Sequence, residues 1–398
     1  MSKKSSNNSL PNILMISSER YPHHDTNTQQ VIKNATAMSE VGVPLELIIP
    51  VQKRNFFDWT YDLPEAVYKY YNVSKSLKIS PLKNIVPASD LRLEKFFHSF
   101  VATIYAVLFR RNDIVYTRNK LAAFLCILLG KKFIFETYRR LGDDSPKTMK
   151  WFSKRAHKDS FVGMVLHSHV SKNSMLKAGI PEEKLLVLHN GFDESDMQPR
   201  LTQLEARQKL GLDPESKYIV YTGNMQENKC IESLIDIAES VPDAQFLLVG
   251  GREEDINRLK AYAKSKELKN VILPGRVPIA MVSTYLFAGD LLIIPPVSAP
   301  LEKFGRTVLP FKIFPYLAAG RVIIAPNLAD MKELLVHEKN AILVEPDNPS
   351  QNAEAIRDTL SDPIFCKKIG EESRETSMSL TWKARGLKFK KWFEGLDL

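Results

Sequence analysis

The 398-residue sequence has few cysteines, no long apolar run and no recognisable secretory signal. Its three cysteines, Cys126, Cys230 and Cys366, are widely spaced and odd in number, which excludes a disulfide framework and a CxxC metal site. The longest apolar runs, 96–109 and 121–130, are shorter than the roughly 20 residues that a membrane-spanning helix needs. The basic start MSKKSSNNSLPN is not followed by the apolar segment of a secretory signal. We therefore expect a cytoplasmic protein without a transmembrane helix, in which residues 1–11 form a flexible polar tail.

Acidic residues are scarce in the first half of the chain. Residues 1–200 carry 29 Lys and Arg against 19 Asp and Glu, whereas the remainder carries 26 against 27. The imbalance is strongest over residues 101–158, where 13 basic and 4 acidic side chains are interleaved with Phe, Tyr and Trp. This pattern suits a membrane surface that carries anionic lipids or equally a nucleic acid, and a solvated basic face without a partner would have the same composition.

Glycine is absent from the loop after the first apolar segment, SERYPHHDTNTQQ, which excludes a GxGxxG dinucleotide fingerprint there. The segment before this loop, 13–17, and the segment 45–50 are predicted to be strands. The apolar residues of the segment between the loop and the second strand have helical spacing, which predicts a helix there. Further strands are expected at 113–117, 131–136, 164–168 and 184–191. A second series follows, with strands expected at 217–223, 244–251, 270–275, 290–296, 321–326 and 340–346.

Two such series predict an α/β protein with two Rossmann-like, doubly wound domains that face a cleft. We expect one domain over residues 12–200 and the other over residues 201–378. Ligands of such sheets bind outside the carboxyl ends of the strands, so the predicted site lies between the domains.

Several motifs of the second half together resemble the C-terminal domain of glycosyltransferase family 4. They are YTGNMQENKCIESLI, FLLVGG, NVILPGRV, TVLPFKIFPYLAAGRVIIAP and ELLVHEKNAILVEPDNP, and a weaker resemblance extends through DIVYTRN and VLHNGFD. That family consists of retaining, metal-independent enzymes of the GT-B fold, which use nucleotide-sugar donors. The resemblance implies an N-terminal acceptor domain, a C-terminal donor domain, and a helix over residues 379–398 that crosses back to the first domain.

Sugar transfer from a nucleoside diphosphate leaves negative charge on the departing phosphate, and stabilising this charge is the main catalytic task. Without a metal, cations and a helix amino terminus must do it. We predict a helix that starts at Pro310, whose free N–H groups at 309–312 face the phosphate, with Arg306 and Lys312 beside it. Lys229 matches the family's lysine that approaches the diphosphate. The predicted catalytic residues are Lys229, Arg306 and Lys312.

The resemblance also implies which residues bind the donor. Asn224 stands where the family frequently has an arginine, and the turn GRV at 275–277 resembles the segment that presents backbone groups to the base. The full set of predicted donor-binding residues is Gly223, Asn224, Arg276, Val277, Glu302, Thr307, Val308 and Leu309.

The sequence departs from the family pattern at the residues that hold the donor. The family commonly has a pair of glutamates separated by seven residues, and here Thr307 and Pro315 stand in their places. A proline costs roughly 3 kcal/mol in a helix interior. Either other groups hold the donor, in a helix that is kinked or starts later, or the donor site has lapsed.

On the acceptor side, the predicted contacts are His23, His24 and Tyr138, and Tyr138 stands where many members have a histidine. His167 and His169 are interpreted as structural, because no carboxylate or cysteine cluster accompanies them in the sequence.

The sequence thus predicts a retaining glycosyltransferase that takes a nucleotide-sugar donor and a glycan or lipid-linked acceptor, in cell-surface polysaccharide or glycolipid synthesis. We expect no metal or other cofactor and no nucleic acid. Peripheral binding to an anionic membrane surface, at the inner face of the membrane, stays open. The alternative is a catalytically lapsed family member that acts as a partner or regulatory subunit, and a nucleic-acid-binding protein has only the charge asymmetry in its favour.

Overall fold

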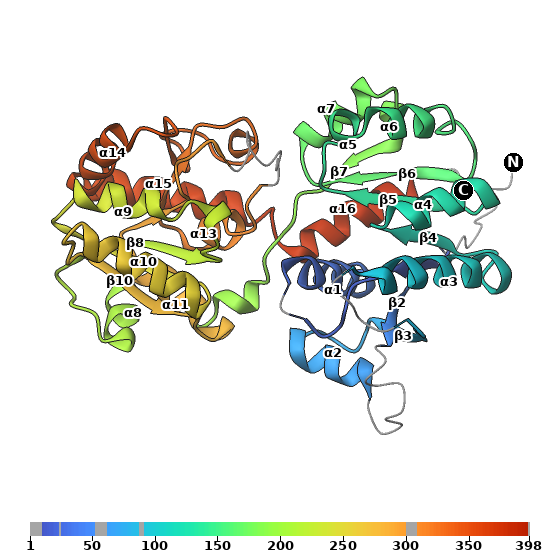
Figure 1. Ribbon diagram of the computed structural model, residues 1–398, viewed down its shortest axis with the longest axis horizontal. Helices are drawn as coiled ribbons and strands as arrows, with labels where there is room; N and C mark the ends of the chain where they lie inside the picture. Colours follow the sequence, from blue (N-terminus) through green and yellow to red (C-terminus); the bar gives the residue numbers. More distant parts are fainter. Residues whose placement is uncertain (1–9, 24, 52–61, 87–90, 300–308, 397–398) are drawn as a thin grey trace, which may run out of the picture. The chain divides into compact units, whose positions relative to one another are not determined.

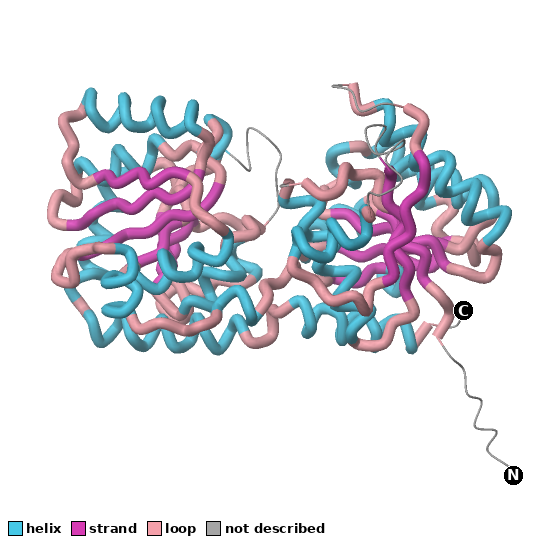
Figure 2. The backbone as a smooth tube through the Cα atoms, turned by 90° about the horizontal axis from the view of Figure 1, so that it is seen from below, coloured by secondary structure: helices cyan, strands magenta, loops and turns pink. Residues whose placement is uncertain are grey.

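The computed structural model describes residues 10–23, 25–51, 62–86, 91–299 and 309–396. The chain divides into two compact units, one of Met1–Asn190 with Trp382–Leu398 and the other of Gly191–Thr381. These limits differ from the domain boundaries expected at 200 and 378. In each unit the strands form one sheet with helices on both faces (Figures 1 and 2).

The first unit contains a seven-stranded parallel sheet in the order β3-β2-β1-β4-β5-β6-β7. Apart from the edge strands β3 and β7, its strands are buried almost throughout, as is typical of parallel sheets that are covered on both faces. They are β1 (Ile13–Ile16), β2 (Leu45–Val51), β3 (Lys78–Lys83), β4 (Ile114–Thr117), β5 (Phe133–Thr137), β6 (Phe161–Leu166) and β7 (Leu185–Val187).

Strand β3 was not expected from the sequence. Its sequence, KISPLK, contains Pro81, which cannot donate a hydrogen bond to a sheet ladder. The strand lies at the edge of the sheet, where one side needs no partner and a proline is tolerated.

Helices cover both faces of the first sheet. On one face are α1 (Thr26–Glu40), α2 (Leu63–Tyr71) and α16 (Trp382–Glu394). On the other are α3 (Leu93–Phe109), α4 (Lys120–Leu129), α5 (Leu141–Asp144), α6 (Pro146–Ser153) and α7 (His169–Lys177). Helix α16 comes from the end of the chain and packs on α1, where a Cβ atom on Gly386 would lie 2.7 Å from the Ala37 carbonyl oxygen.

The second unit contains a six-stranded parallel sheet in the order β10-β9-β8-β11-β12-β13. The strands are β8 (Lys217–Gly223), β9 (Ala244–Gly250), β10 (Val271–Gly275), β11 (Leu291–Ile293), β12 (Val322–Pro326) and β13 (Ile342–Val344). One face carries α8 (Gln203–Leu210), α11 (Ile279–Ala288) and α13 (Ile313–Ala319). The other carries α9 (Glu232–Glu239), α10 (Glu253–Ser265), α14 (Pro349–Ser361) and α15 (Pro363–Ser377).

The prediction of two doubly wound parallel sheets is therefore confirmed. In each sheet the strand order reverses once, between β1 and β4 in the first unit and between β8 and β11 in the second. Ligands of such sheets bind beside this reversal, at the carboxyl ends of the strands. Over the described ranges, no helix combines the length and the apolar character needed to cross a bilayer.

Candidate functional site

Helix α13 begins at Ile313, so the predicted start at Pro310 is wrong. The Ile313 and Phe314 N–H groups donate to the carbonyl oxygens of Pro310 (2.9 Å) and Phe311 (3.3 Å), which forms a tight turn before the helix. The first α-helical bond runs from the N–H group of Tyr316 to the carbonyl of Lys312, over 3.0 Å. Pro315 thus lies in the first turn, where a helix makes no use of its N–H groups, and it causes no break.

The predicted phosphate cradle, formed by N–H groups at 309–312, stays a prediction. The hydrogen bonds of this turn come from the next two N–H groups, those of Ile313 and Phe314, which already donate to protein carbonyls. The side chain of Leu309, a predicted donor-binding residue, is buried in the hydrophobic core. Lys312, by contrast, stands directly before the helix.

Tyr316 fixes α13 against the carboxyl end of β8. Its buried hydroxyl oxygen accepts a hydrogen bond of 2.7 Å from the Thr222 N–H group. One turn earlier, the Lys312 ammonium nitrogen lies 3.4 Å from the centroid of the Tyr221 ring, which is a cation–π contact. A Cβ atom on Gly223 would lie 3.2 Å from that nitrogen, so the glycine leaves room for the lysine.

Two positive charges converge at this end of β8. Burial lowers the pKa of Lys312 well below its usual value, and the positive charge of Lys229 lowers it further. Lys229 ends the short 3₁₀ helix η4 (Glu227–Lys229), in the loop that follows β8. The structure therefore brings together three of the predicted residues, Gly223, Lys229 and Lys312. An anion bound beside both lysines would favour their charged forms.

Asn224 shapes the loop that leads to Lys229. Its side-chain oxygen accepts a hydrogen bond of 3.2 Å from the Gln226 N–H group, and its side-chain nitrogen donates to the Gln226 side chain over 3.1 Å. Its carbonyl accepts a bond of 2.6 Å from the Tyr221 hydroxyl. Asn224 is thus used in holding the backbone of the loop, as asparagine commonly is in turns.

Arg276 lies in a separate hollow of about 560 Å³ at the carboxyl ends of β9 and β10 and the start of α10. Gly251, Arg252 and Lys260 also line it. Val277, the next residue, is partly buried and packs against the core of the unit. Four further predicted residues, Glu302, Arg306, Thr307 and Val308, lie outside the described residues, as does His24 of the first unit.

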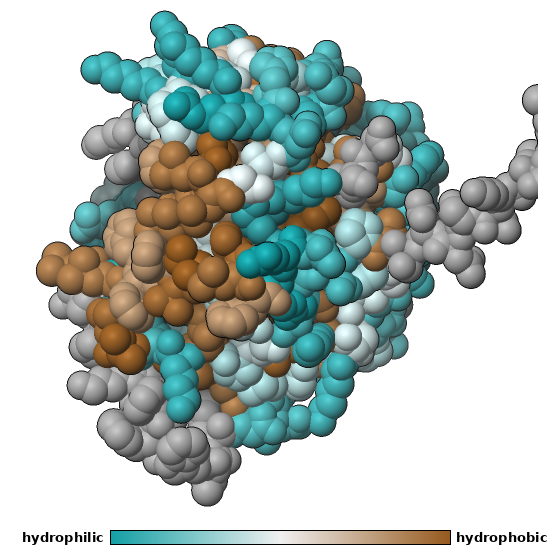
Figure 3. All heavy atoms as spheres, turned by 90° about the vertical axis from the view of Figure 1, so that its right-hand side faces the viewer, coloured by the Kyte–Doolittle hydropathy of each residue, from teal (hydrophilic) through white to brown (hydrophobic). Residues whose placement is uncertain are grey.

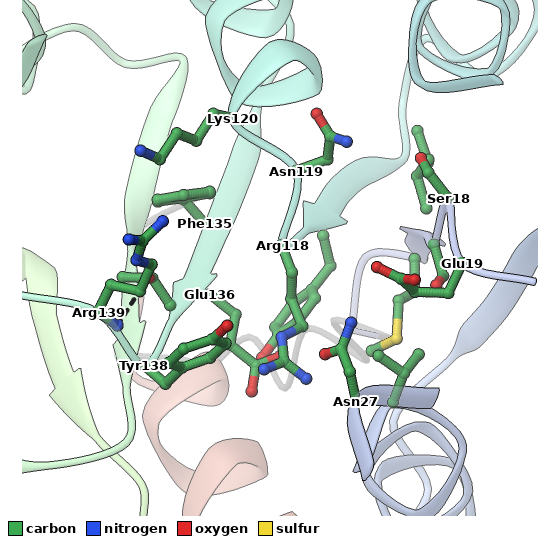
Figure 4. A pocket seen from close by; sticks show the side chains of 16 residues that line it. Ser18, Glu19, Asn27, Arg118, Asn119, Lys120, Phe135, Glu136, Tyr138 and Arg139 are labelled. Carbon is green, nitrogen blue, oxygen red and sulfur yellow. Dashed lines mark hydrogen bonds between the residues drawn. The ribbon is translucent and has the colours of Figure 1, made fainter. Parts of the chain in front are cut away.

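The first unit has a pocket of about 230 Å³ at the carboxyl ends of β1, β4 and β5, beside the reversal of strand order. Figure 4 shows Arg118 beside Tyr138 and Glu136, with Asn27 opposite. The Arg118 guanidinium carbon lies 5.5 Å from the centroid of the Tyr138 ring. Of the predicted acceptor residues, Tyr138 lines this pocket.

His23 does not line the pocket in the part of the chain that is described. Its side-chain Nδ1 atom lies 3.4 Å from a carboxylate oxygen of Asp25. Its backbone N–H group donates a hydrogen bond of 2.9 Å to the Tyr71 hydroxyl. The structure thus places His23 and Tyr138 in different surroundings.

The floor of the pocket contains a buried ionic group that the sequence analysis missed. A carboxylate oxygen of Glu136 accepts a hydrogen bond of 2.8 Å from the Arg385 guanidinium and lies 2.6 Å from the Nε2 atom of His167. Burial alone would raise the pKa of Glu136, but Arg118, His167 and Arg385 hold it well below its usual range. Burial lowers the pKa of His167 to about 4.

The interpretation of His167 as structural is consistent with this burial, but the statement that no carboxylate accompanies it is wrong. One signal for this ionic group was present in the sequence. Glu136 interrupts the apolar run of β5, and a buried carboxylate needs charged or hydrogen-bonding partners. Its partner Arg385 lies 249 residues further along the chain and could not have been identified. Among the described residues no group of three or more His, Cys, Asp and Glu is placed to hold a metal ion.

Comparison with known proteins gives matches to glycosyltransferases. Residues 202–376 match the family model of glycosyl transferases group 1. An uncharacterized glycosyltransferase of Methanocaldococcus jannaschii is 27% identical over 202 residues, which are 49% of this chain and 50% of that protein. The alpha-galactosylglucosyldiacylglycerol synthase of Streptococcus pneumoniae is 31% identical over 144 residues, 34% of this chain and 37% of that protein. The chain thus spans about half or less of the length of these two relatives.

Among solved structures, HepE of Anabaena in complex with UDP matches with a TM-score of 0.71 at 15% identity, covering 97% of this chain and 100% of that chain. At this identity the likeness concerns the fold, and it agrees with the expected GT-B arrangement of two parallel sheets. Residues 202–376, which match the family model of glycosyl transferases group 1, make up most of the second unit.

Proposed function

We propose that this chain is a retaining glycosyltransferase that moves a sugar from a nucleoside-diphosphate sugar to a glycan or lipid-linked acceptor without a metal ion. The observation that carries the proposal is the convergence of Lys229 and Lys312 at the carboxyl end of β8. Both lysines lie in the segment that matches the family model. The UDP bound to HepE supports a nucleotide donor, and the name of the pneumococcal synthase supports a lipid-linked acceptor.

The two lysines would act on the leaving diphosphate. Its negative charge grows as the bond between the anomeric carbon and the phosphate oxygen breaks, so cations fixed beside it stabilise the transition state more than the ground state. Lys312 is partly buried, and a charge with little water around it interacts more strongly than one in solvent. Arg306 is proposed as a third cation.

The proton balance needs no dedicated base on the protein. The acceptor hydroxyl oxygen forms a bond to the anomeric carbon, and its proton passes to the phosphate oxygen that leaves. In this scheme the carboxylates missing at Thr307 and Pro315 are not part of the chemistry. They would affect only how the donor is held.

We assign the acceptor to the pocket of the first unit. Tyr138, Asn27 and Asn119 line it and can exchange hydrogen bonds with sugar hydroxyls. Arg118 and Lys120 add positive charge, which suits an acceptor with an anionic group. Such acceptors occur in the synthesis of cell-surface polysaccharides and glycolipids, a process that we place on the cytoplasmic side.

Pro315 lies before the first α-helical bond and does not break the helix, so the proline itself no longer supports the alternative of a catalytically lapsed subunit. That alternative now depends on the missing carboxylates alone. Calorimetric titration with UDP, GDP and their sugar conjugates separates the two functions, followed by a screen for hydrolysis and transfer. Lys229→Ala and Lys312→Ala should each weaken binding at least about tenfold. The exposed Lys209→Ala on α8 serves as the control. If the unmodified chain binds no nucleotide, the lapsed-subunit function is favoured.

A further inference from the structure

Helix α3 buries its polar face and exposes its apolar face, which is the reverse of an ordinary surface helix. The residues that it buries are small or polar, namely Glu94, His98, Ser99, Ala102, Thr103 and Ala106. The large apolar residues Phe96, Phe100, Leu108 and Phe109 are exposed. A surface helix of a soluble protein normally directs its apolar stripe toward the core.

Polar contacts hold α3 in this orientation. A carboxylate oxygen of the buried Glu94 accepts a hydrogen bond of 2.7 Å from the Arg20 guanidinium. The hydroxyl groups of Ser99 and Ser18 are 2.6 Å apart and share a hydrogen bond. Rotating the helix to bury its phenylalanines would break these contacts, so their exposure follows from the fold.

Helix α4 extends the same apolar surface. It packs beside α3 and exposes Phe124, Leu128 and Leu129, and no charged residue lies between Leu121 and Leu129. Figure 3 views the molecule from the side on which α3 and α4 lie in Figure 1, and apolar side chains gather there over a continuous area. We call this surface the α3–α4 face and define it by Phe96, Phe100, Leu108, Phe109, Phe124, Leu128 and Leu129. Apolar areas of this kind mark binding sites.

Exposed basic side chains flank the α3–α4 face. Arg111 and Lys132 follow the ends of α3 and α4, and both are exposed. Helix α6 adjoins α4 through the stacked rings of Phe124 and Trp151, whose centroids are 4.8 Å apart. It adds the exposed Lys147, Lys150 and Lys154. None of these five basic residues is paired with a carboxylate in the described part of the chain.

We propose that the α3–α4 face is a membrane-docking surface that inserts its apolar side chains at the boundary of an anionic bilayer. An apolar centre with a basic rim is the pattern of proteins that lie in the membrane interface. Anionic head groups would neutralise the rim while the acyl region takes up the apolar side chains. This proposal does not depend on transferase activity.

A second copy of the chain fits this surface less well. In a symmetric dimer the same patch meets itself, which would bring two basic rims together. Like charges that face each other across an interface oppose association. The carboxylates at the ends of α3 cannot compensate, since Glu94 is paired with Arg20 and Asp113 with Arg110.

The test is co-sedimentation of the full chain with phosphatidylcholine vesicles, with and without phosphatidylglycerol. The variant Leu108→Glu/Leu128→Glu changes leucines that are 53% and 57% exposed. The matched control, Leu204→Glu/Leu387→Glu, makes the same charge change at leucines that are each 51% exposed. We expect binding to vesicles with phosphatidylglycerol that falls at least about tenfold in the first variant and less than about twofold in the control.

Added salt, and separately the variant Arg111→Ser/Lys132→Ser, should weaken binding to the anionic vesicles. Three results would overturn the proposal. They are no sedimentation of the unmodified chain with anionic vesicles, an equal loss in the control, and a dimer in solution that Leu108→Glu/Leu128→Glu dissociates while vesicles bind nothing. Circular dichroism and thermal unfolding confirm that each variant is folded.

Discussion

The ammonium nitrogen of Lys312 lies over the ring of Tyr221, 3.4 Å from its centroid. The ring replaces only part of the hydration that the ammonium loses on burial, and Lys229 adds repulsion. The free protein therefore keeps a lysine under electrostatic strain, which a bound anion would relieve.

Nucleotide binding should take up a proton at pH values above the lowered pKa of Lys312. Because the pKa of Lys312 is lowered in the free protein, a bound diphosphate would raise it again. Affinity should consequently fall as pH rises through the lowered value. Titration with UDP in buffers of different ionisation enthalpy measures the proton uptake, and Lys312→Met should abolish it. Equal uptake in that variant would place the titrating group elsewhere.

Lys312→Met should also stabilise the free protein. The unfolded chain binds a proton at this lysine up to a pH near its ordinary pKa of 10.5, whereas the folded chain binds it less readily. The lysine therefore reduces the free energy of unfolding at every pH below 10.5, with the full cost below its lowered pKa. We expect the Tm at neutral pH to rise by about 2 °C or more, and an unchanged or lower Tm would contradict this account.

Gly223→Ala should weaken nucleotide binding by roughly tenfold. The added Cβ atom would lie 3.2 Å from the Lys312 ammonium nitrogen and 3.3 Å from the Tyr221 hydroxyl. Gly211→Ala is the matched control, because that glycine also has a positive φ but has no atom within 4 Å of the added Cβ. Both variants should lose about 1 kcal/mol of stability, and only Gly223→Ala should lose affinity in calorimetry.

Two buried histidines should make the fold sensitive to mild acid. Burial lowers the pKa of His98 and of His167 from the ordinary histidine value of 6.5 to about 4 in each case. The unfolded chain binds these protons first, so the free energy of unfolding should fall as pH drops from 6.5 toward 4. His167→Gln should reduce the slope of urea-derived stability against pH in this window, whereas the exposed His157→Gln should not.

Tyr138→Phe tests the acceptor pocket. If its hydroxyl contacts the acceptor, the variant should raise the acceptor KM by several-fold to tenfold and leave the donor KM unchanged. Tyr70→Phe, at another exposed tyrosine of the first unit, is the control. A change in the donor KM alone would move Tyr138 out of the acceptor site.

Much of the fold could be predicted because buried parallel strands are almost continuous apolar runs. The expected strand at 217–223 matches β8 to the residue. Strand β3 escaped prediction because it is an edge strand with a proline, and its alternation of exposed and buried residues is weak. The start of α13 was misplaced because Pro310 and Pro315 both suit a first turn, and local sequence does not choose between them.

The candidate site could be predicted only where its residues are close in sequence or match a family motif. Gly223 and Lys229 belong to one loop, and Lys312 was found by its motif. The Glu136–Arg385 pair had no such signal, because the fold alone brings α16 under β5. Which of the lysines is desolvated also depends on Tyr221 and Tyr316, whose placement follows from tertiary packing.

The place of α16 has a consequence for biosynthesis. This helix supplies Arg385, which hydrogen-bonds to Glu136 and to the backbone of Leu188 and His189 in the unit that leaves the ribosome first. Until translation reaches α16, Glu136 lacks the guanidinium group of Arg385, and the surface of α1 that packs on α16 is uncovered. The nascent first unit therefore remains incomplete while the whole of the second unit is synthesised. During this interval it exposes the most surface to which a chaperone would bind.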